Sequence, residues 1–431
     1  MRVLVAGASI AGPALAHWLS RRGAAVTVVE QAPGLRPGGQ AVDARGVAKE
    51  VIRRMGLDAE VRAVCTDTAG AYTVDADGTV LETFRADDDD GDGYIAEIEV
   101  LRGDLSRVLY DETRDRVDYL FGDRIAELTQ DADGVDVTFA GGERRRFDLV
   151  VGADGLHSAL REMVFGPHEQ FVRHLGLVLA FYSVPNEFGL DRWVIDYQEA
   201  GRSAGLRPVH DATRAIAMLS FPSPDVDVDR RDVDAQKRFV RERMTGCGWL
   251  TPRILAHLDD TPDFYLDQVA QVVMDRWHVG RVGLLGDAAF SASPMSGAGT
   301  GLALVGAYLL AGELAAADWD PEAGFAGYEA RMRSYVEDNQ EIGRMHVQSL
   351  AAVDPAADPA ADPAADPAAD PAADPAADPA ADPAADPAAD PGPEPDLEVL
   401  TALIERAVGG PELPDYEGLP AGVAPAWRPQ G

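Results

Sequence analysis

The first thirty residues constrain the fold more than any other stretch of the chain. A short apolar run, Val3–Val5, leads into the segment GASIAG, Gly7–Gly12. Apolar residues then recur at helical spacing over Leu15–Leu19, and a second apolar run, Val26–Val29, ends at Glu30. This order predicts a buried strand, a tight turn, a helix and a second parallel strand. The chain is therefore expected to open with a βαβ unit of an α/β fold.

The turn of this unit is a variant of the glycine-rich loop that binds dinucleotides, with Ser9 where a middle glycine is expected. A serine side chain is small enough to let the backbone approach phosphate, and the helix N-terminus offers N–H groups to a pyrophosphate. Glu30 lies 18 residues beyond Gly12, where a carboxylate can accept hydrogen bonds from an adenosine ribose. A tight turn in another kind of β–α unit is the alternative. The predicted cofactor contacts are Gly7, Ser9, Ile10, Ala11, Gly12 and Glu30.

Two later segments decide which dinucleotide is bound. FDLVVGADGLHSALR, Phe147–Arg161, has an apolar strand pattern that runs into Asp154 and a helix start. GRVGLLGDAAFSASPMSGAGTGLALVGAYLLAGEL, Gly280–Leu314, has a strand pattern ending at Asp287, a loop, and a glycine-rich entry into a long helix. With the first loop, these segments resemble the aromatic-hydroxylase family of single-component, group A FAD monooxygenases. Each motif alone is weakly specific, whereas the ordered trio is specific, and the resemblance covers roughly residues 1–350.

The resemblance implies FAD as the cofactor and a role for each segment. In the family the first loop binds the ADP half, the segment at Asp154 lies at the pyrophosphate, and the aspartate equivalent to Asp287 binds the ribityl chain. Two arginines are implied as further contacts: Arg45 in GGQAVDARG and Arg102 in VLRGDLSRVL. For each arginine a solvated surface charge is the alternative.

The glycine-rich entry to the last helix is expected to face the flavin ring, because its N–H groups and dipole stabilise negative charge on reduced flavin. The further contacts expected there are Gly297, Ala298, Gly299 and Thr300, and Gly286, which precedes Asp287, is a further expected cofactor contact. Pro294, Met295 and Gly297 form the expected active-site loop, and no side chain is assigned as a catalytic acid or base because the flavin performs the chemistry. Phe290 stands where many relatives have histidine after GDAA.

The resemblance implies an NAD(P)H-dependent monooxygenase that inserts one atom of O2 into a small hydrophobic, aromatic or polyketide-like molecule. In the family the reaction passes through a flavin C4a-hydroperoxide, which survives only where water is excluded. NADH or NADPH is expected as a transient co-substrate, since the chain shows no separate βαβ unit for it. A reductase or oxidase without oxygen insertion and a non-catalytic flavoprotein that sequesters a metabolite are the alternatives. The WxWxIP signature of flavin halogenases is absent.

The expected fold class is α/β, with a Rossmann-like FAD domain, an inserted substrate domain built on a largely antiparallel sheet, and C-terminal helices. Alternating apolar residues in Leu177–Val184 and Arg214–Phe221 predict strands of that sheet. The expected boundaries are FAD domain 1–73, 97–165 and 277–353, an exposed hairpin region 74–96, substrate domain 166–276, linker 354–395, and C-terminal helix and tail 396–431.

Side chains of the expected sheet are candidates for the substrate pocket. Phe181, Trp193, Met218 and Phe221 could line it, although aromatic and Met residues in strands are more often plain core. His210 is expected to be structural or exposed rather than a catalytic base.

Charge and cysteine content bound the partners and the compartment. The chain has 38 Lys and Arg against 73 Asp and Glu, a net charge of −35, which repels nucleic acid and anionic membrane surfaces. Only Cys65 and Cys247 occur, which suggests neither disulfides nor a zinc site and fits the cytoplasm. A secretory signal at the N-terminus is the alternative to the first strand. The apolar run Leu302–Ala317 is too short for a membrane span and contains an acid, so we expect no transmembrane segment.

A four-residue DPAA repeat runs over Asp354–Pro391. Proline at every fourth position forbids a continuous helix, and no large apolar side chain is present to bury, so we expect an extended, disordered linker. Beyond it, Asp396–Val408 has apolar residues at helical spacing. This segment is expected to form a terminal amphipathic helix that docks back on the body.

Overall fold

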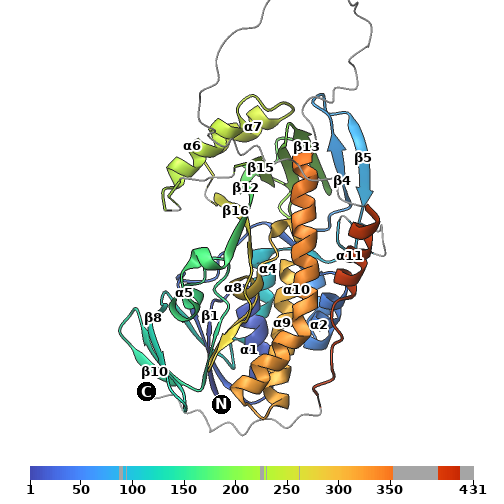
Figure 1. Cartoon of the computed structure of the whole chain (residues 1–431). Helices are drawn as coiled ribbons and strands as arrows, with labels where there is room; N and C mark the ends of the chain where they lie inside the picture. Colours follow the sequence, from blue (N-terminus) through green and yellow to red (C-terminus); the bar gives the residue numbers. More distant parts are fainter. Residues whose placement is uncertain are drawn as a thin grey trace, which may run out of the picture.

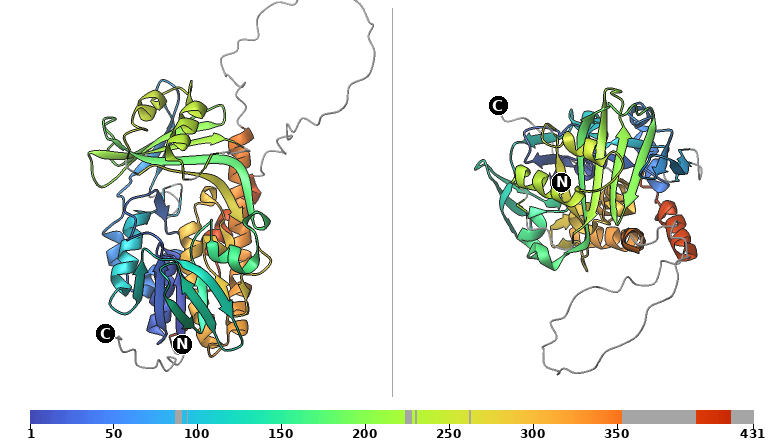
Figure 2. Two further views of the ribbon diagram at one scale, coloured as in Figure 1. Left: turned by 90° about the vertical axis from the view of Figure 1, so that its left-hand side faces the viewer. Right: turned by 90° about the horizontal axis from the view of Figure 1, so that it is seen from above.

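The computed structural model describes residues 1–86, 91–93, 95–223, 228–229, 231–261, 263–352 and 397–417. The acidic run Asp87–Asp90 and the DPAA repeat lie outside the described residues. Two bodies are stacked, with a six-stranded sheet and its helices below and a seven-stranded sheet lying across them (Figures 1 and 2).

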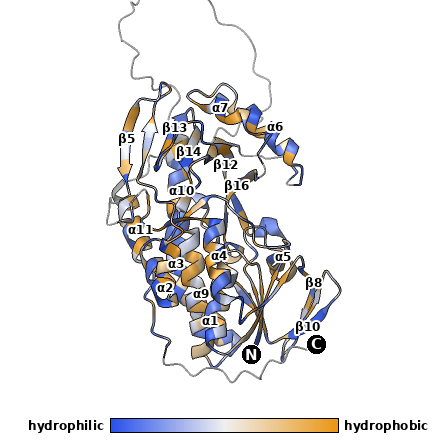
Figure 3. Ribbon diagram, turned by 180° about the vertical axis from the view of Figure 1, so that it is seen from behind, coloured by the Kyte–Doolittle hydropathy of each residue, from blue (hydrophilic) through white to orange (hydrophobic). Residues whose placement is uncertain are grey.

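The lower body is built on a mostly parallel sheet in the order β17-β18-β11-β1-β2-β7. Its strands are β17 (His278–Val279), β18 (Val282–Leu284), β11 (Leu149–Gly152), β1 (Arg2–Ala6), β2 (Ala25–Glu30) and β7 (Asp118–Phe121). All neighbours pair in parallel except β17 and β18. The central strands are buried and coloured mostly as hydrophobic in Figure 3, as expected for a sheet covered on both faces.

Helices cover one face of this sheet and a small antiparallel sheet covers the other (Figure 1). The helices of the lower body are α1 (Ala11–Arg21), α2 (Val47–Met55), α3 (Asp58–Arg62), α4 (Arg102–Thr113), α5 (Ala159–Phe165), α8 (Asp287–Phe290), α9 (Gly299–Ala316) and α10 (Pro321–Ala352). Of these, α5 lies on the side of the small sheet and contacts it. The small sheet has the order β10-β9-β8, with β8 (Ile125–Gln130), β9 (Val135–Phe139) and β10 (Arg144–Phe147). A two-stranded sheet, β3 (Ala41–Asp43) and β6 (Glu99–Leu101), lies towards the upper body.

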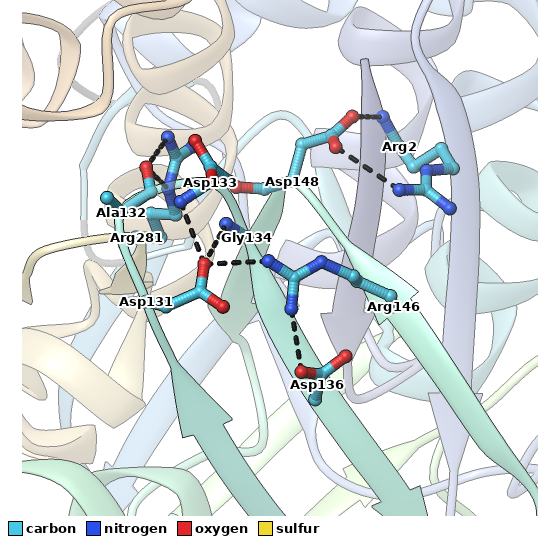
Figure 4. A network of polar contacts seen from close by, with 9 residues as sticks. All are labelled: Arg2, Asp131, Ala132, Asp133, Gly134, Asp136, Arg146, Asp148 and Arg281. Carbon is cyan, nitrogen blue, oxygen red and sulfur yellow. Dashed lines mark hydrogen bonds and ion pairs between the residues drawn. The ribbon is translucent and has the colours of Figure 1, made fainter.

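A polar network fastens the small sheet to the base of the lower body (Figure 4). Arg281 donates to the carbonyl oxygens of Ala132 and Asp148, the former from Nε at 3.0 Å. Arg146 bridges Asp131 and Asp136 at 2.6 Å each. These contacts therefore stabilise the hairpin of β8 and β9 and connect it to Arg281, which directly precedes β18 of the main sheet.

The upper body is a seven-stranded sheet in the order β16-β12-β15-β14-β13-β4-β5, antiparallel except between β13 and β4. Its strands are β16 (Tyr265–Val272), β12 (Val172–Pro185), β15 (Arg214–Pro222), β14 (Arg202–Pro208), β13 (Trp193–Glu199), β4 (Gly70–Val74) and β5 (Val80–Arg85). Helices α6 (Val233–Met244) and α7 (Thr251–Ala256) pack on its outer face. The predicted fold class, including the largely antiparallel sheet, is confirmed.

Two long elements connect the bodies. Strand β12 has a register shift between His174 and Val178, and Val172 belongs to the lower core while Val178 belongs to the upper one. Helix α10 runs beside both bodies in Figure 1. The predicted terminal helix is α11 (Leu397–Gly409), which packs on α10 through Leu403 and Ala407 against Ile342 and Met345.

Helix α9 is the one described helix that is long and apolar enough to cross a membrane by length and composition. However, 83% of it is buried inside the protein, where it contacts α1, α2 and α10. It is the central core helix of the lower body.

Candidate functional site

The first loop has the backbone geometry that its glycines predict. Gly7 has φ of 108°, and a side chain there would meet the Ala153 carbonyl oxygen at 2.3 Å. At Gly12 a Cβ would lie 1.9 Å from the Gly7 oxygen. Helix α1 follows at Ala11, and its N-cap residue Ile10 supplies no side-chain cap. The first N–H groups of the helix are therefore left for another acceptor, as an anion-binding terminus requires.

Glu30 closes this loop from the end of β2. Its two carboxylate oxygens accept hydrogen bonds from the backbone N–H groups of Ala8, at 3.0 Å, and Ala32, at 2.9 Å. Each oxygen retains further lone pairs, because a carboxylate can accept about four hydrogen bonds. The predicted ribose contact stays a prediction, with the carboxylate placed beside the loop.

Arg102, at the start of α4, lies over the same loop. Its Nη1 donates to the Ser9 hydroxyl at 3.0 Å, so the structure joins two predicted cofactor contacts that are 93 residues apart. Burial lowers the pKa of Arg102. Within the described part of the chain no carboxylate oxygen lies within 4.0 Å of this guanidinium. A half-buried cation without a carboxylate partner is suited to an anionic ligand such as a pyrophosphate.

Asp154 follows β11 and is turned towards α5. Its carboxylate accepts from the Ser158 hydroxyl at 2.5 Å and from the Leu160 N–H at 3.1 Å. Burial raises its pKa. The next residue, Gly155, has φ of 83° and open space around its Cβ position. In this segment it is therefore the backbone at Gly155, rather than the Asp154 carboxylate, that is free to approach a ligand.

Asp287 opens the short helix α8, directly after Gly286, which has φ of 63°. The Asp287 side chain is exposed, yet protein atoms surround it so densely that burial raises its pKa, with Ser291 and His157 opposing that effect. A carboxylate that solvent can reach although many protein atoms surround it lies in a concave part of the surface. It is suited to accept hydrogen bonds from ligand hydroxyls.

The entry to α9 is open at its glycines. Gly297, at φ of 67°, and Gly299 have no atom within 4 Å of their Cβ positions, whereas Thr300 is buried. The N-cap residue Ala298 makes no side-chain cap, and its own N–H donates to Ser296 at 3.2 Å. The 18-residue helix thus begins with uncapped N–H groups and the positive end of its dipole beside these open glycines.

Side chains of β16 and α10 hold the loop before α9, which contains Pro294 and Met295. The Gln271 amide donates to the Ala292 oxygen at 3.2 Å, and His346 Nδ1 lies 2.7 Å from the Met295 oxygen. Phe290 packs against Trp277 with ring centroids 4.6 Å apart. The position that lacks the expected histidine is therefore filled by core packing.

Arg45 lies at the end of β3 and is half-buried. Its Nη2 forms an ion pair with Asp43 at 2.8 Å. The following residue, Gly46, has φ of 47°, and its Cβ would meet the Val408 oxygen of α11 at 1.8 Å. The structure therefore anchors Arg45 rather than leaving it as a solvated surface charge.

The four aromatic and Met candidates divide between the two faces of the upper sheet. Phe181 and Met218 pair across β12 and β15 on the face towards the lower body. Phe221 is buried on the outer face, with its ring 5.5 Å from Phe239 of α6, and Trp193 stacks on Tyr72 at 4.3 Å. Strand alternation turns Phe221 and Trp193 away from the lower body, so these two fit the alternative of plain core packing.

His210 is exposed and lines a cavity of about 710 Å³ with Thr66, Thr68 and Glu99. The exposed position is one of the two expected for His210, and its lack of a role as a base stays a prediction.

The comparisons with known proteins agree with this geometry. The sequence model of a family described as an FAD binding domain matches residues 1–348. The chain belongs to the FAD-dependent monooxygenase family. An uncharacterised protein of Mycobacterium tuberculosis is 47% identical over 341 residues, covering 78% of this chain and 91% of that protein. A flavin-dependent monooxygenase of Legionella longbeachae is 37% identical over 350 residues, covering 80% and 88%.

Among solved structures, the tetracycline destructase Tet(55) superimposes with a TM-score of 0.79 at 35% identity, covering 96% of this chain and 98% of that one. The family assignment confirms FAD as the cofactor, and the loop at Ser9, the carboxylate of Asp287 and the entry to α9 fit it.

Sequence reasoning missed two polar groups at the junction of the bodies. His157 Nε2 lies 2.9 Å from Asp267 of β16, which also accepts from Tyr265 at 3.0 Å. Glu99 of β6 pairs with Arg207 of β14. His157 lies in the segment Phe147–Arg161, three residues after Asp154. A titratable residue in this motif could therefore have been predicted as part of the site from the sequence. Glu99 and Arg207 carry no local motif.

Proposed function

We propose that this chain is an NAD(P)H-dependent monooxygenase that transfers one oxygen atom from O2 to a small hydrophobic, aromatic or polyketide-like substrate. Two observations carry the proposal: Arg102 is hydrogen-bonded to Ser9 of the first loop, and Gly286, next to Asp287, lies against Ala11 of α1 and Ala303 of α9, where a Cβ on it would be 3.2 and 3.9 Å from their Cβ atoms. Bound FAD supplies electron transfer and oxygen activation, and the protein supplies the site.

Each part of the site has its own task in this proposal. The loop at Ser9, with Arg102, holds the pyrophosphate, while Asp287 accepts hydrogen bonds from the ribityl hydroxyls. The N–H groups at the start of α9 stabilise negative charge on the flavin ring. Arg45, held by Asp43, contacts the flavin from the opposite loop.

The upper sheet supplies the substrate side. Phe181 and Met218 present apolar surface to the lower body, where exclusion of water favours oxygen transfer over loss of the oxidant. The similarity to Tet(55), a tetracycline destructase, supports a polycyclic aromatic substrate class. From the net charge of −35 we infer an enzyme without nucleic-acid or membrane partners.

The experiment that tests the proposal incubates the FAD-loaded protein with candidate phenolic and polycyclic substrates, NADH or NADPH, and ¹⁸O2. A product that gains one ¹⁸O atom, with nicotinamide oxidation that depends on substrate, is the expected result. Oxidation of substrate without label would assign an oxidase instead, and reduction of substrate at the expense of NADH or NADPH would assign a reductase. A purified, folded protein that binds no FAD would contradict the proposal at its first step.

A further inference from the structure

A buried ion pair joins the two bodies beside the candidate site. Glu99 of β6 and Arg207 of β14 are hydrogen-bonded, with side chains 5% and 15% exposed. The other oxygen of Glu99 accepts from the Thr66 hydroxyl at 2.6 Å and the Thr68 hydroxyl at 2.7 Å. Arg207 and the two hydroxyls together hold Glu99 ionised, because they lower its pKa against the opposing effect of burial.

A second carboxylate lies directly across the ladder from Glu99. In the antiparallel pairing of β3 with β6, Asp43 is the cross-strand partner of Glu99. Burial and the charge of Glu99 raise the pKa of Asp43, while Arg45 and Arg207 lower it. Two like charges opposite each other in a sheet destabilise it unless each has its own cation. Here Arg207 forms an ion pair with Glu99, and Arg45 forms one with Asp43 at 2.8 Å.

The two guanidinium groups come from different bodies. Arg207 reaches down from the upper sheet, whereas Arg45 lies on the loop that follows β3 in the lower body. If Arg207 were lost, Arg45 would be attracted to the carboxylates of both Asp43 and Glu99. If Glu99 lost its charge, Arg207 would compete with Arg45 for Asp43. In either case Arg45 would leave the position that its ion pair with Asp43 fixes.

We propose that Arg207 is a positioning residue for the cofactor site: by holding Glu99, it leaves Asp43 to fix Arg45 beside the flavin. The proposal rests on the contact between Arg45 and FAD in the proposed function. According to this proposal, the seven-stranded sheet of the upper body influences FAD affinity indirectly. Its Arg207 does so by balancing charge and does not contact the cofactor.

The experiment measures the FAD dissociation constant of the deflavinated protein by fluorescence titration, together with the melting temperature. The variants are Arg207→Gln, Glu99→Gln, the double variant with both changes, Arg45→Gln, and Arg45→Gln combined with Arg207→Gln. Arg214→Gln is the matched control, because Arg214 belongs to the same sheet and pairs with the exposed Asp263 at 3.6 Å.

We expect Arg207→Gln and Glu99→Gln each to raise the dissociation constant about tenfold. The double variant should return to within about twofold of the wild type, since the remaining Asp43 and Arg45 balance each other. Arg45→Gln should weaken binding, and should add little in the Arg207→Gln background. Arg214→Gln should change nothing.

Either single variant can fail to fold because it leaves a buried charge unpaired, and the other then carries the comparison with the double variant. The proposal would be wrong if a folded single variant kept its FAD affinity, or if the double variant did not restore an affinity lost in the single variants. The ion pair of Glu99 with Arg207 would then only connect the two bodies. An Arg45→Gln protein with wild-type affinity would instead contradict the proposed contact of Arg45 with FAD.

Discussion

Asp287 is the residue on which cofactor affinity is expected to depend most directly. Asp287→Ala removes an acceptor and leaves the ribityl hydroxyls unpaired, a loss of about 1 to 3 kcal/mol, or a ten- to hundredfold weaker FAD complex. The apo fold should survive, because the side chain is exposed. Titration of deflavinated wild type and variant with FAD measures the difference, and Asp287→Asn, which keeps one acceptor, is the control.

The pH dependence of FAD binding belongs to the same residue. Burial raises the pKa of Asp287 above its ordinary value of 3.8, so on acidification it takes up a proton earlier than a solvated aspartate. The protonated form is a poorer acceptor, so FAD affinity should fall as pH is lowered through this raised pKa and be retained above it. Asp287→Ala should lose that dependence. Equal dissociation constants at all pH values would leave Asp287 as a cap of the following turn.

Residues joined by a local motif were predictable from the sequence, whereas partners distant in the chain were not. The spacing of Gly7, Gly12 and Glu30 predicts a loop whose geometry the structure reproduces. In contrast, Glu99 and Arg207 are 108 residues apart, and only the tertiary fold brings them into contact. Strand alternation also separated Met218 from Phe221, a distinction that requires knowing which face the helices cover.

At the scale of elements, the periodicity of apolar residues predicted which strands and helices form better than it predicted which strands pair. Both quoted strands of the upper sheet and the terminal helix occur where expected. The region 74–96 was expected as an exposed hairpin region, and its strand β5 forms the edge of the seven-stranded sheet, joined through β4 to β13 in parallel. A parallel pairing between strands so distant in sequence leaves no local pattern, because it depends on how the two bodies stack.

Helix α11 offers a matched pair of neighbours for testing its docking. Leu403 is 7% exposed and packs on Ile342 and Met345 of α10, whereas Ile404 is 37% exposed. Leu403→Ala should destabilise the docked helix by about 2 to 3 kcal/mol, because it removes buried methyl groups and leaves a cavity. Ile404→Ala should cost less than about 1 kcal/mol. Protease cleavage after α10 should accelerate in the first variant alone, and equal effects would contradict the docking of α11 through Leu403.

At the scale of the whole molecule, α10 ends at Ala352 and α11 begins at Leu397. The body is therefore completed by a helix whose position is set by contacts with α10 and with the Gly46 loop. The repeat between them contributes ten of the aspartates and no large apolar side chain. Its composition predicts that it adds charge and chain length without adding buried surface.

Shortening the repeat within Asp354–Pro391 to half its length should leave the melting temperature and the FAD content of the purified protein unchanged. Closure entropy changes by only about 0.6 kcal/mol for each doubling of a flexible loop, and a shorter loop brings α11 to α10 slightly more readily. The contacts of Leu403 and the ion pair of Arg406 with Asp338 at 3.0 Å do not depend on the repeat. A variant of native length in which each repeat Asp is replaced by Ser separates charge from length. A large fall in melting temperature in the shortened protein, but not in the Ser variant, would show that the length of the repeat itself supports the docked helix.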